Sequence, residues 1–174
     1  MHIRQEQTKD HPNVFRLIQQ AFEKEVHSDH REQFLVERLR HSDAFVPALS
    51  LVAEEDGNIV GYILLTKINI VNNDTRYPAL ALAPVAVLPG HQGKGIGGKL
   101  IKAAHEKAIA AGFTAVVVLG HAHYYPRFGY KMAKTFGIRL PFEVPEENSM
   151  VLELTAGALK EVTGVVEYAT PFFE

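Results

Sequence analysis

Residues 85–98 read VAVLPGHQGKGIGG, and this stretch decides how the chain can fold. Its alternating valines favour a strand, and its glycines precede a segment in which Ile96, Leu100, Ala104 and Ala108 share one helical face. Glycines at a strand-to-helix junction let backbone N–H groups approach an anion closely, and the helix dipole favours negative charge there. The stretch therefore predicts a phosphate-binding loop between a strand and a helix.

The rest of the chain predicts a mixed sheet with helices. Apolar residues at helical spacing predict helices over 10–22, with Asp10 as N-cap, and over 28–41. Strands are expected at 49–53, 60–71, 79–88, 115–119, 136–140, 150–154 and 165–168. Pro84 interrupts a run that otherwise resembles a central buried strand. Because proline cannot donate a ladder hydrogen bond, it predicts a bulge or a splay there.

The composition limits the function classes. With 174 residues, 47% of them hydrophobic, the chain fits one soluble domain, with about 141–174 as a C-terminal extension packed on it. The absence of cysteine excludes disulfides, thiolate metal sites and a cysteine nucleophile. A net charge of −2 with scattered lysines and arginines argues against nucleic-acid binding. No leader and no membrane-length apolar segment is visible, so we expect a cytoplasmic location.

Three cofactors could occupy the glycine loop. A nucleoside triphosphate loop needs Ser or Thr after its lysine, but Lys94 is followed by Gly95. Residues 93–98 match the dinucleotide pattern Gly-x-Gly-x-x-Gly. However, the connection before them is long, and no acidic residue ends the next strand, at Leu119-Gly120-His121. Coenzyme A remains, because its pyrophosphate needs only the glycine loop and the helix N-terminus.

The flanking residues carry a family resemblance. Residues 92–97 read Gln-x-x-Gly-x-Gly after Val-x-Val-x-Pro at 85–89, and Tyr125-Pro126-Arg127-Phe128-Gly129-Tyr130 follows the next strand. This combination resembles the GNAT superfamily of N-acetyltransferases, over nearly the whole chain in element order, and specifically a bacterial subgroup of predicted N-acetyltransferases. The resemblance implies an α/β, GNAT-like fold: a mixed, splayed β-sheet with helices on both faces.

The resemblance also implies an activity and a binding site. The activity is direct transfer of an acetyl group from acetyl-CoA to a primary amine of a small-molecule or peptide acceptor. In the implied site, backbone groups of Val85 and Val87 hold the pantetheine arm, Gln92 shapes the turn and the glycine N–H groups hold the pyrophosphate. The cofactor-binding residues expected are Val85, Ala86, Val87, Gln92, Gly93, Lys94, Gly95, Ile96, Gly97 and Gly98.

Tyr125 matches the position where many members of that family keep a general-acid tyrosine. A phenol is protonated at neutral pH and can donate to a thiolate. Tyr125 could instead be a packing aromatic, in which case Tyr124 is the fallback acid. A backbone N–H near Val85 could polarise the thioester carbonyl.

The general base is left open. Many members carry a glutamate on the fourth strand, where this chain has Pro84, so that base is missing. Glu25, His27, Glu54 or a chain of waters could replace it.

Two further features of the sequence bear on the function. The His121-x-His123 pair lacks an evident third ligand, so we expect no metal, and these histidines are expected to line the thioester end of the cleft. The missing glutamate leaves a non-catalytic acyl-CoA-binding or sensing domain as the alternative function. The family also allows a homodimer formed through the last strands.

Overall fold

The computed structural model describes residues 1–174, with three α-helices and nine strands. The helices are α1 (His11–Phe22), α2 (Glu32–Arg40) and α3 (Ile96–Ala110). The strands are β1 (His2–Gln5), β2 (Phe45–Glu55), β3 (Asn58–Asn72), β4 (Thr75–Val87), β5 (Ala115–Leu119), β6 (Lys131–Met132), β7 (Ile138–Arg139), β8 (Ser149–Glu153) and β9 (Gly164–Glu167). None of the helices has the length and hydropathy needed to cross a bilayer.

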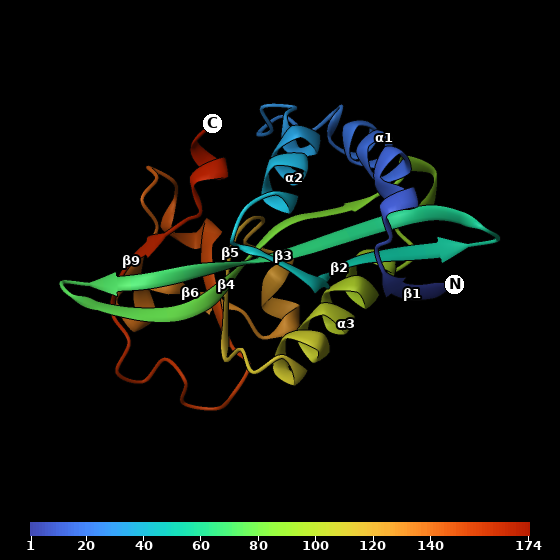
Figure 1. Cartoon of the computed structure of the whole chain (residues 1–174). Helices are drawn as coiled ribbons and strands as arrows, with labels where there is room; N and C mark the ends of the chain where they lie inside the picture. Colours follow the sequence, from blue (N-terminus) through green and yellow to red (C-terminus); the bar gives the residue numbers. More distant parts are fainter.

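All nine strands belong to one mixed sheet. Its order is β1-β2-β3-β4-β5-β8-β6, and β9 pairs with both β3 and β7. β4 and β5 are parallel, as are β7 and β9, while the other pairs are antiparallel. Helices α1 and α2 cover one face of the sheet and α3 covers the other (Figure 1). The predicted mixed sheet with helices on both faces is confirmed.

The alternation along β3 decides which helix packs where. Tyr62 and Leu64 point to the α1 and α2 face, and Ile63 and Leu65 point to the α3 face. Gly61 allows α3 to approach closely, because a Cβ there would lie 2.9 Å from Leu100 Cδ1. The two faces of one strand therefore build two separate hydrophobic clusters.

Some predicted boundaries were wrong. The second helix begins at Glu32, not near residue 28, because the side chains of Ser28 and Asp29 accept hydrogen bonds from the N–H groups of His30 and Arg31. Such contacts favour a turn over a helix. The strand expected at 136–140 is reduced to the two residues of β7, because the chain before it forms a 3-10 helix, Ala133–Phe136.

β4 changes partner along its length, and this opens the sheet. It pairs with β3 from Thr75 to Val87, but with β5 only at Leu80–Leu82, opposite Val116–Val118. Two β4 residues, Ala83 and Pro84, lie where β3 has only Leu64. This bulge confirms the interruption predicted at Pro84.

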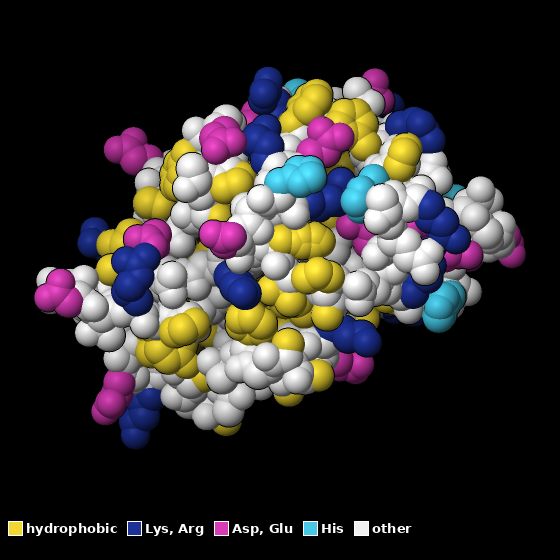
Figure 2. Space-filling model, in the orientation of Figure 1, with side chains coloured by type: hydrophobic (Ala, Val, Ile, Leu, Met, Phe, Trp, Pro, Cys, Tyr) yellow, Lys and Arg dark blue, Asp and Glu magenta, His cyan; other side chains and the backbone are white.

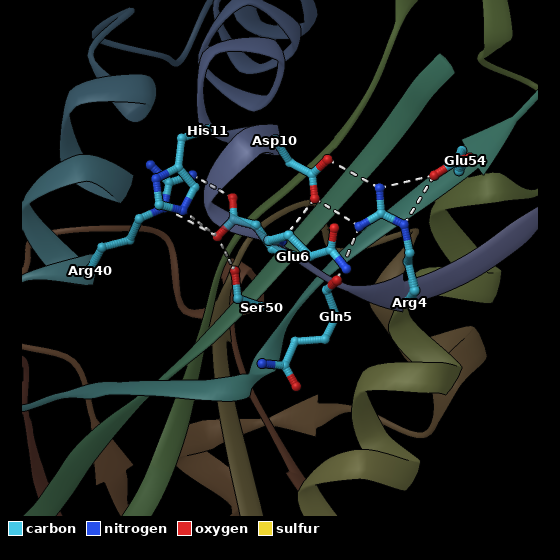
Figure 3. A network of polar contacts seen from close by, with 9 residues as sticks. Arg4, Gln5, Glu6, Asp10, His11, Arg40, Ser50 and Glu54 are labelled. Carbon is cyan, nitrogen blue, oxygen red and sulfur yellow. Dashed lines mark hydrogen bonds and ion pairs between the residues drawn. The ribbon is translucent and has the colours of Figure 1, made fainter. Parts of the chain in front are cut away.

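A polar network fixes the edge of the sheet to α2 (Figure 3). The buried carboxylate of Glu6 accepts hydrogen bonds from Arg40 Nη2 at 2.5 Å and from Ser50 Oγ at 2.9 Å. A buried carboxylate is tolerated only when it is paired and hydrogen-bonded, so these contacts hold the end of α2 against β2. The network thereby fixes the C-terminal end of α2 to the sheet near the start of α1.

Arg4 joins two acidic side chains beside this network. It contacts Asp10 at 2.7 Å and Glu54 at 2.9 Å. Asp10 does occupy the N-cap position of α1, but its carboxylate accepts from Arg4 and from the N–H of Gln7 rather than from the helix.

Candidate active site

The edge of β4 that faces β5 carries unpaired backbone groups. The N–H of Leu88 donates to the carbonyl of Val60, so Ala86 and Tyr62 form the next hydrogen-bonded pair in the antiparallel ladder. The N–H and C=O groups of Val85 and Val87 therefore point away from β3. Since β5 has already separated, they face the gap between the two strands. The side chain of Ala86, by contrast, is buried under α1 and α2.

The glycine loop follows this edge directly. Gly93 and Gly95 have φ values of +77° and +78°, a conformation that glycine adopts without steric cost. Gln92 Nε2 donates to the carbonyl of Val87 at 3.0 Å and so closes the loop onto the strand. α3 starts at Ile96, whose side chain is buried in the core. Residues 92–95 are exposed, and the first N–H groups of α3 lack intrahelical partners.

Two glycines in the first turn of α3 have a second role that the sequence did not reveal. A Cβ on Gly97 would lie 3.0 Å from the hydroxyl oxygen of Tyr124, and one on Gly98 would lie 3.3 Å from the ring of Phe128. These glycines let the 3-10 helix Tyr125–Phe128 and the residue before it pack directly on α3. The glycine loop and the segment Tyr124–Phe128 therefore both adjoin the first turn of α3.

The structure separates the two candidate acids. The hydroxyl of Tyr124 lies beside Gly97, at the loop end of the gap, and Arg127 stacks over its ring at 4.9 Å. The ring of Tyr125 lies instead against Gly120, just after β5, where β4 and β5 begin to separate. The two tyrosine rings are in contact, but they pack against different elements: Tyr124 against the start of α3, and Tyr125 against the end of β5.

Tyr125 is held on three sides. A Cβ on Gly120 would lie 2.4 Å from Tyr125 Cε2, and the rings of Tyr124 and Tyr130 meet Tyr125 edge-on at 5.1 and 5.6 Å. Burial raises the pKa of Tyr125 above its usual value, so the phenol stays protonated well beyond neutral pH. Its hydroxyl makes no hydrogen bond and is not among the fully buried polar atoms, so it opens on solvent-accessible space.

The candidate bases have different surroundings. Glu54 is engaged with Arg4 at the β1 edge, and His27 is exposed without a polar contact. Glu25, in the connection between α1 and α2, places its Oε2 3.9 Å from Nε2 of His121, which follows β5. This acid–base pair links two elements across the mouth of the gap.

His121 and His123 have no third metal-ligating partner. The structure contains no group of three or more histidines, aspartates and glutamates that could hold an ion. Both histidines are exposed.

His105 on α3 forms a hydrogen bond that sequence reasoning missed. Its Nε2 lies 2.8 Å from the hydroxyl of Tyr130. Desolvation by burial lowers the pKa of His105 to about 4, so the imidazole is neutral at physiological pH. Burial also raises the pKa of Tyr130 far above its usual value.

The lowered pKa of His105 makes stability depend on pH. Because the folded state disfavours the imidazolium, the unfolded state binds more protons as the pH falls from 6.5 towards 4, and folding is weakened in that window. At acidic pH the wild type should therefore lose free energy of unfolding through His105, on the order of 2 kcal/mol. His105→Gln should not show this loss. Urea unfolding at pH 7 and pH 4.5 measures it, and His41→Gln, which removes an exposed histidine, is the control. Equal pH dependence of the wild type and His105→Gln would contradict the assignment.

Sequence comparisons identify related proteins. A family model described as an acetyltransferase (GNAT) domain matches residues 2–133. The uncharacterized N-acetyltransferase YjhQ of Escherichia coli K12 is 39% identical over 145 residues, 81% of this chain and 80% of the relative. The uncharacterized N-acetyltransferase YhbS of the same strain is 32% identical over 173 residues, 99% of this chain and 98% of the relative.

Solved structures agree with the sequence comparisons. The GNAT family N-acetyltransferase YhbS of E. coli, in complex with CoA, superposes with a TM-score of 0.89 at 29% identity, over 99% of this chain and 92% of that one. A GNAT acetyltransferase from Brucella melitensis, in complex with acetyl-CoA, gives 0.81 at 32% identity, over 98% and 97%. The predicted fold and enzyme class are confirmed, and the chain belongs to the GNAT family of acetyltransferases.

Proposed function

We propose that this chain transfers an acetyl group from acetyl-CoA to a primary amine by direct attack in a ternary complex. The observation that carries the proposal is the unpaired edge of β4, which runs straight into a glycine loop at the start of α3. An extended ligand with a pyrophosphate at one end fits this arrangement. The complexes with CoA and acetyl-CoA among the structural relatives support the same cofactor.

The cofactor contacts follow from the direction of the backbone. The outward N–H and C=O groups of Val85 and the N–H of Val87 pair with the amides of the pantetheine arm, while the C=O of Val87 accepts a hydrogen bond from Gln92. The loop Gln92–Gly98, including Lys94, surrounds the pyrophosphate, whose charge is favoured by the dipole of α3. Ile96 has a buried side chain and takes part through its backbone alone. Ala86 offers no such contact, because its side chain is buried and its N–H and C=O groups face Tyr62 of β3.

The reaction needs a proton donor for sulfur and a proton acceptor for nitrogen. The amine nitrogen attacks the thioester carbonyl carbon, the C–S bond breaks, and the leaving thiolate takes the hydroxyl proton of Tyr125. A backbone N–H near Val85 stabilises the oxyanion. His121 accepts the proton of the amine, and the carboxylate of Glu25 stabilises the resulting imidazolium. Tyr125 regains its proton from solvent after the thiol leaves.

The glycine loop gives the first test. Gly95→Ala forces a residue with a Cβ into a left-handed conformation, at a cost of about 1 to 2 kcal/mol. We expect this to weaken acetyl-CoA binding by about tenfold, measured by titration calorimetry. Gly90→Ala is the control, since that glycine has no positive φ and open space around it. Equal affinity of both variants would argue against the loop as the pyrophosphate site.

The acid is tested at Tyr125 and at its support. Tyr125→Phe should lower kcat by about 100-fold with little change in acetyl-CoA affinity, because the ring remains but the proton donor is lost. Gly120→Ala should also lower kcat, since its Cβ would displace the Tyr125 ring. Thiol release with a panel of primary amines measures both. If Tyr125→Phe retains wild-type turnover, Tyr125 has no role in proton transfer.

The base is tested by the Glu25 and His121 pair. Glu25→Gln and His121→Gln should each lower kcat/KM for the amine by about tenfold, and the double variant should lower it no further, because the two residues act as one unit. Glu23→Gln, at a neighbouring exposed glutamate, is the control. Independent, additive losses would show that the pair does not act together.

The alternative function is a non-catalytic acyl-CoA-sensing domain, and turnover on an amine acceptor distinguishes it from a transferase. A sensing domain would bind acetyl-CoA tightly without turnover on any amine, whereas membership of the family favours the transferase. Four further points stay predictions. They are a small-molecule or peptide amine as the acceptor, a homodimer, a cytoplasmic location, and a single domain with an extension from about residue 141.

A further inference from the structure

The hydroxyl of Tyr130 lies in the core and has a single hydrogen-bond partner. Tyr130 is 2% exposed and belongs to the apolar cluster beneath α3. Its hydroxyl lies 2.8 Å from Nε2 of His105 and has no other partner. The pair is therefore a polar contact between α3 and the segment after Tyr125, beside an apolar cluster.

The ring of Tyr130 is also one wall of the enclosure around Tyr125. The two rings meet edge-on, with centroids 5.6 Å apart and planes inclined by 73°. On another side, Tyr125 is already so close to Gly120 that no methyl group fits between them. Tyr125 is thus confined between Gly120 and two rings, and a shift of Tyr130 would remove one of these three supports.

We propose that His105 is a positioning residue for acetyl transfer: through the Tyr130 hydroxyl it fixes the ring against which Tyr125 is held. The inference rests on the proposed role of Tyr125 as the acid. Without the imidazole, the Tyr130 hydroxyl is buried and unpaired, a state that proteins avoid by moving the group towards a partner or water. Tyr125 then loses its alignment with the thiolate although it is not itself changed.

Three variants separate this role from packing. His105→Leu removes the partner of the hydroxyl, His105→Gln keeps a hydrogen-bonding group, and His105→Leu with Tyr130→Phe removes both polar groups together. We expect His105→Leu to lower kcat by about tenfold, with the KM for acetyl-CoA changed by less than about twofold. His105→Gln and the double variant should each recover most of the loss, because neither leaves a buried hydroxyl without a partner.

Each outcome has a defined meaning. Folded His105→Leu with wild-type kcat overturns the proposal, as does a double variant whose kcat does not recover. If Tyr125→Phe itself keeps wild-type kcat, the acid assignment fails first. If Tyr125→Phe is slow but His105→Leu is not, the positioning role alone fails.

Discussion

The fold depends on the fact that β4 cannot keep both of its neighbours. Past Leu82, β4 stays paired with β3 through the bulge at Ala83 and Pro84, but it no longer pairs with β5. Backbone groups in the interior need partners, so the edge at Val85 and Val87 is incomplete as a sheet. In the proposed function, the amide groups of the pantetheine arm complete it. The interruption that makes this a poor central strand is therefore what makes it a binding edge.

A second constraint joins cofactor binding to proton transfer. The glycines at the start of α3 serve two neighbours: their backbone faces the loop, and their missing side chains admit Tyr124 and Phe128. The glycine loop proposed to hold the pyrophosphate and the segment that carries Tyr125 therefore pack on the same turn of α3. Their relative position is set by packing contacts rather than by a flexible connection, which suits a reaction in which donor and thioester must stay aligned.

The sequence predicted the parts of the site that are local. The loop needs glycines at given positions, and Pro84 cannot sit in a regular central strand, so both could be recognised from a few adjacent residues. The contact of Gly120 with Tyr125 could not, because it depends on how the chain turns back after β5. Glu25 and His121 are distant in sequence and meet only when the α1–α2 connection lies over the end of β5. The pairing of β9 with β3 is likewise a property of the assembled sheet.

The two sides of the gap between β4 and β5 differ in burial. On the cofactor side, the tyrosine is enclosed by buried rings and a glycine, and a buried hydrogen bond to α3 fixes one of those rings. On the acceptor side of the proposed site, the candidate base pair comes from exposed connections, with His121 70% exposed. Acidic and basic side chains are intermixed on the face of the molecule that Figure 2 shows. Substitutions in exposed connections disturb stability little, whereas substitutions in the enclosure disturb packing. If the proposed mechanism holds, residues around Glu25 and His121 can therefore vary with the acceptor at little cost in stability, whereas the residues that enclose Tyr125 cannot.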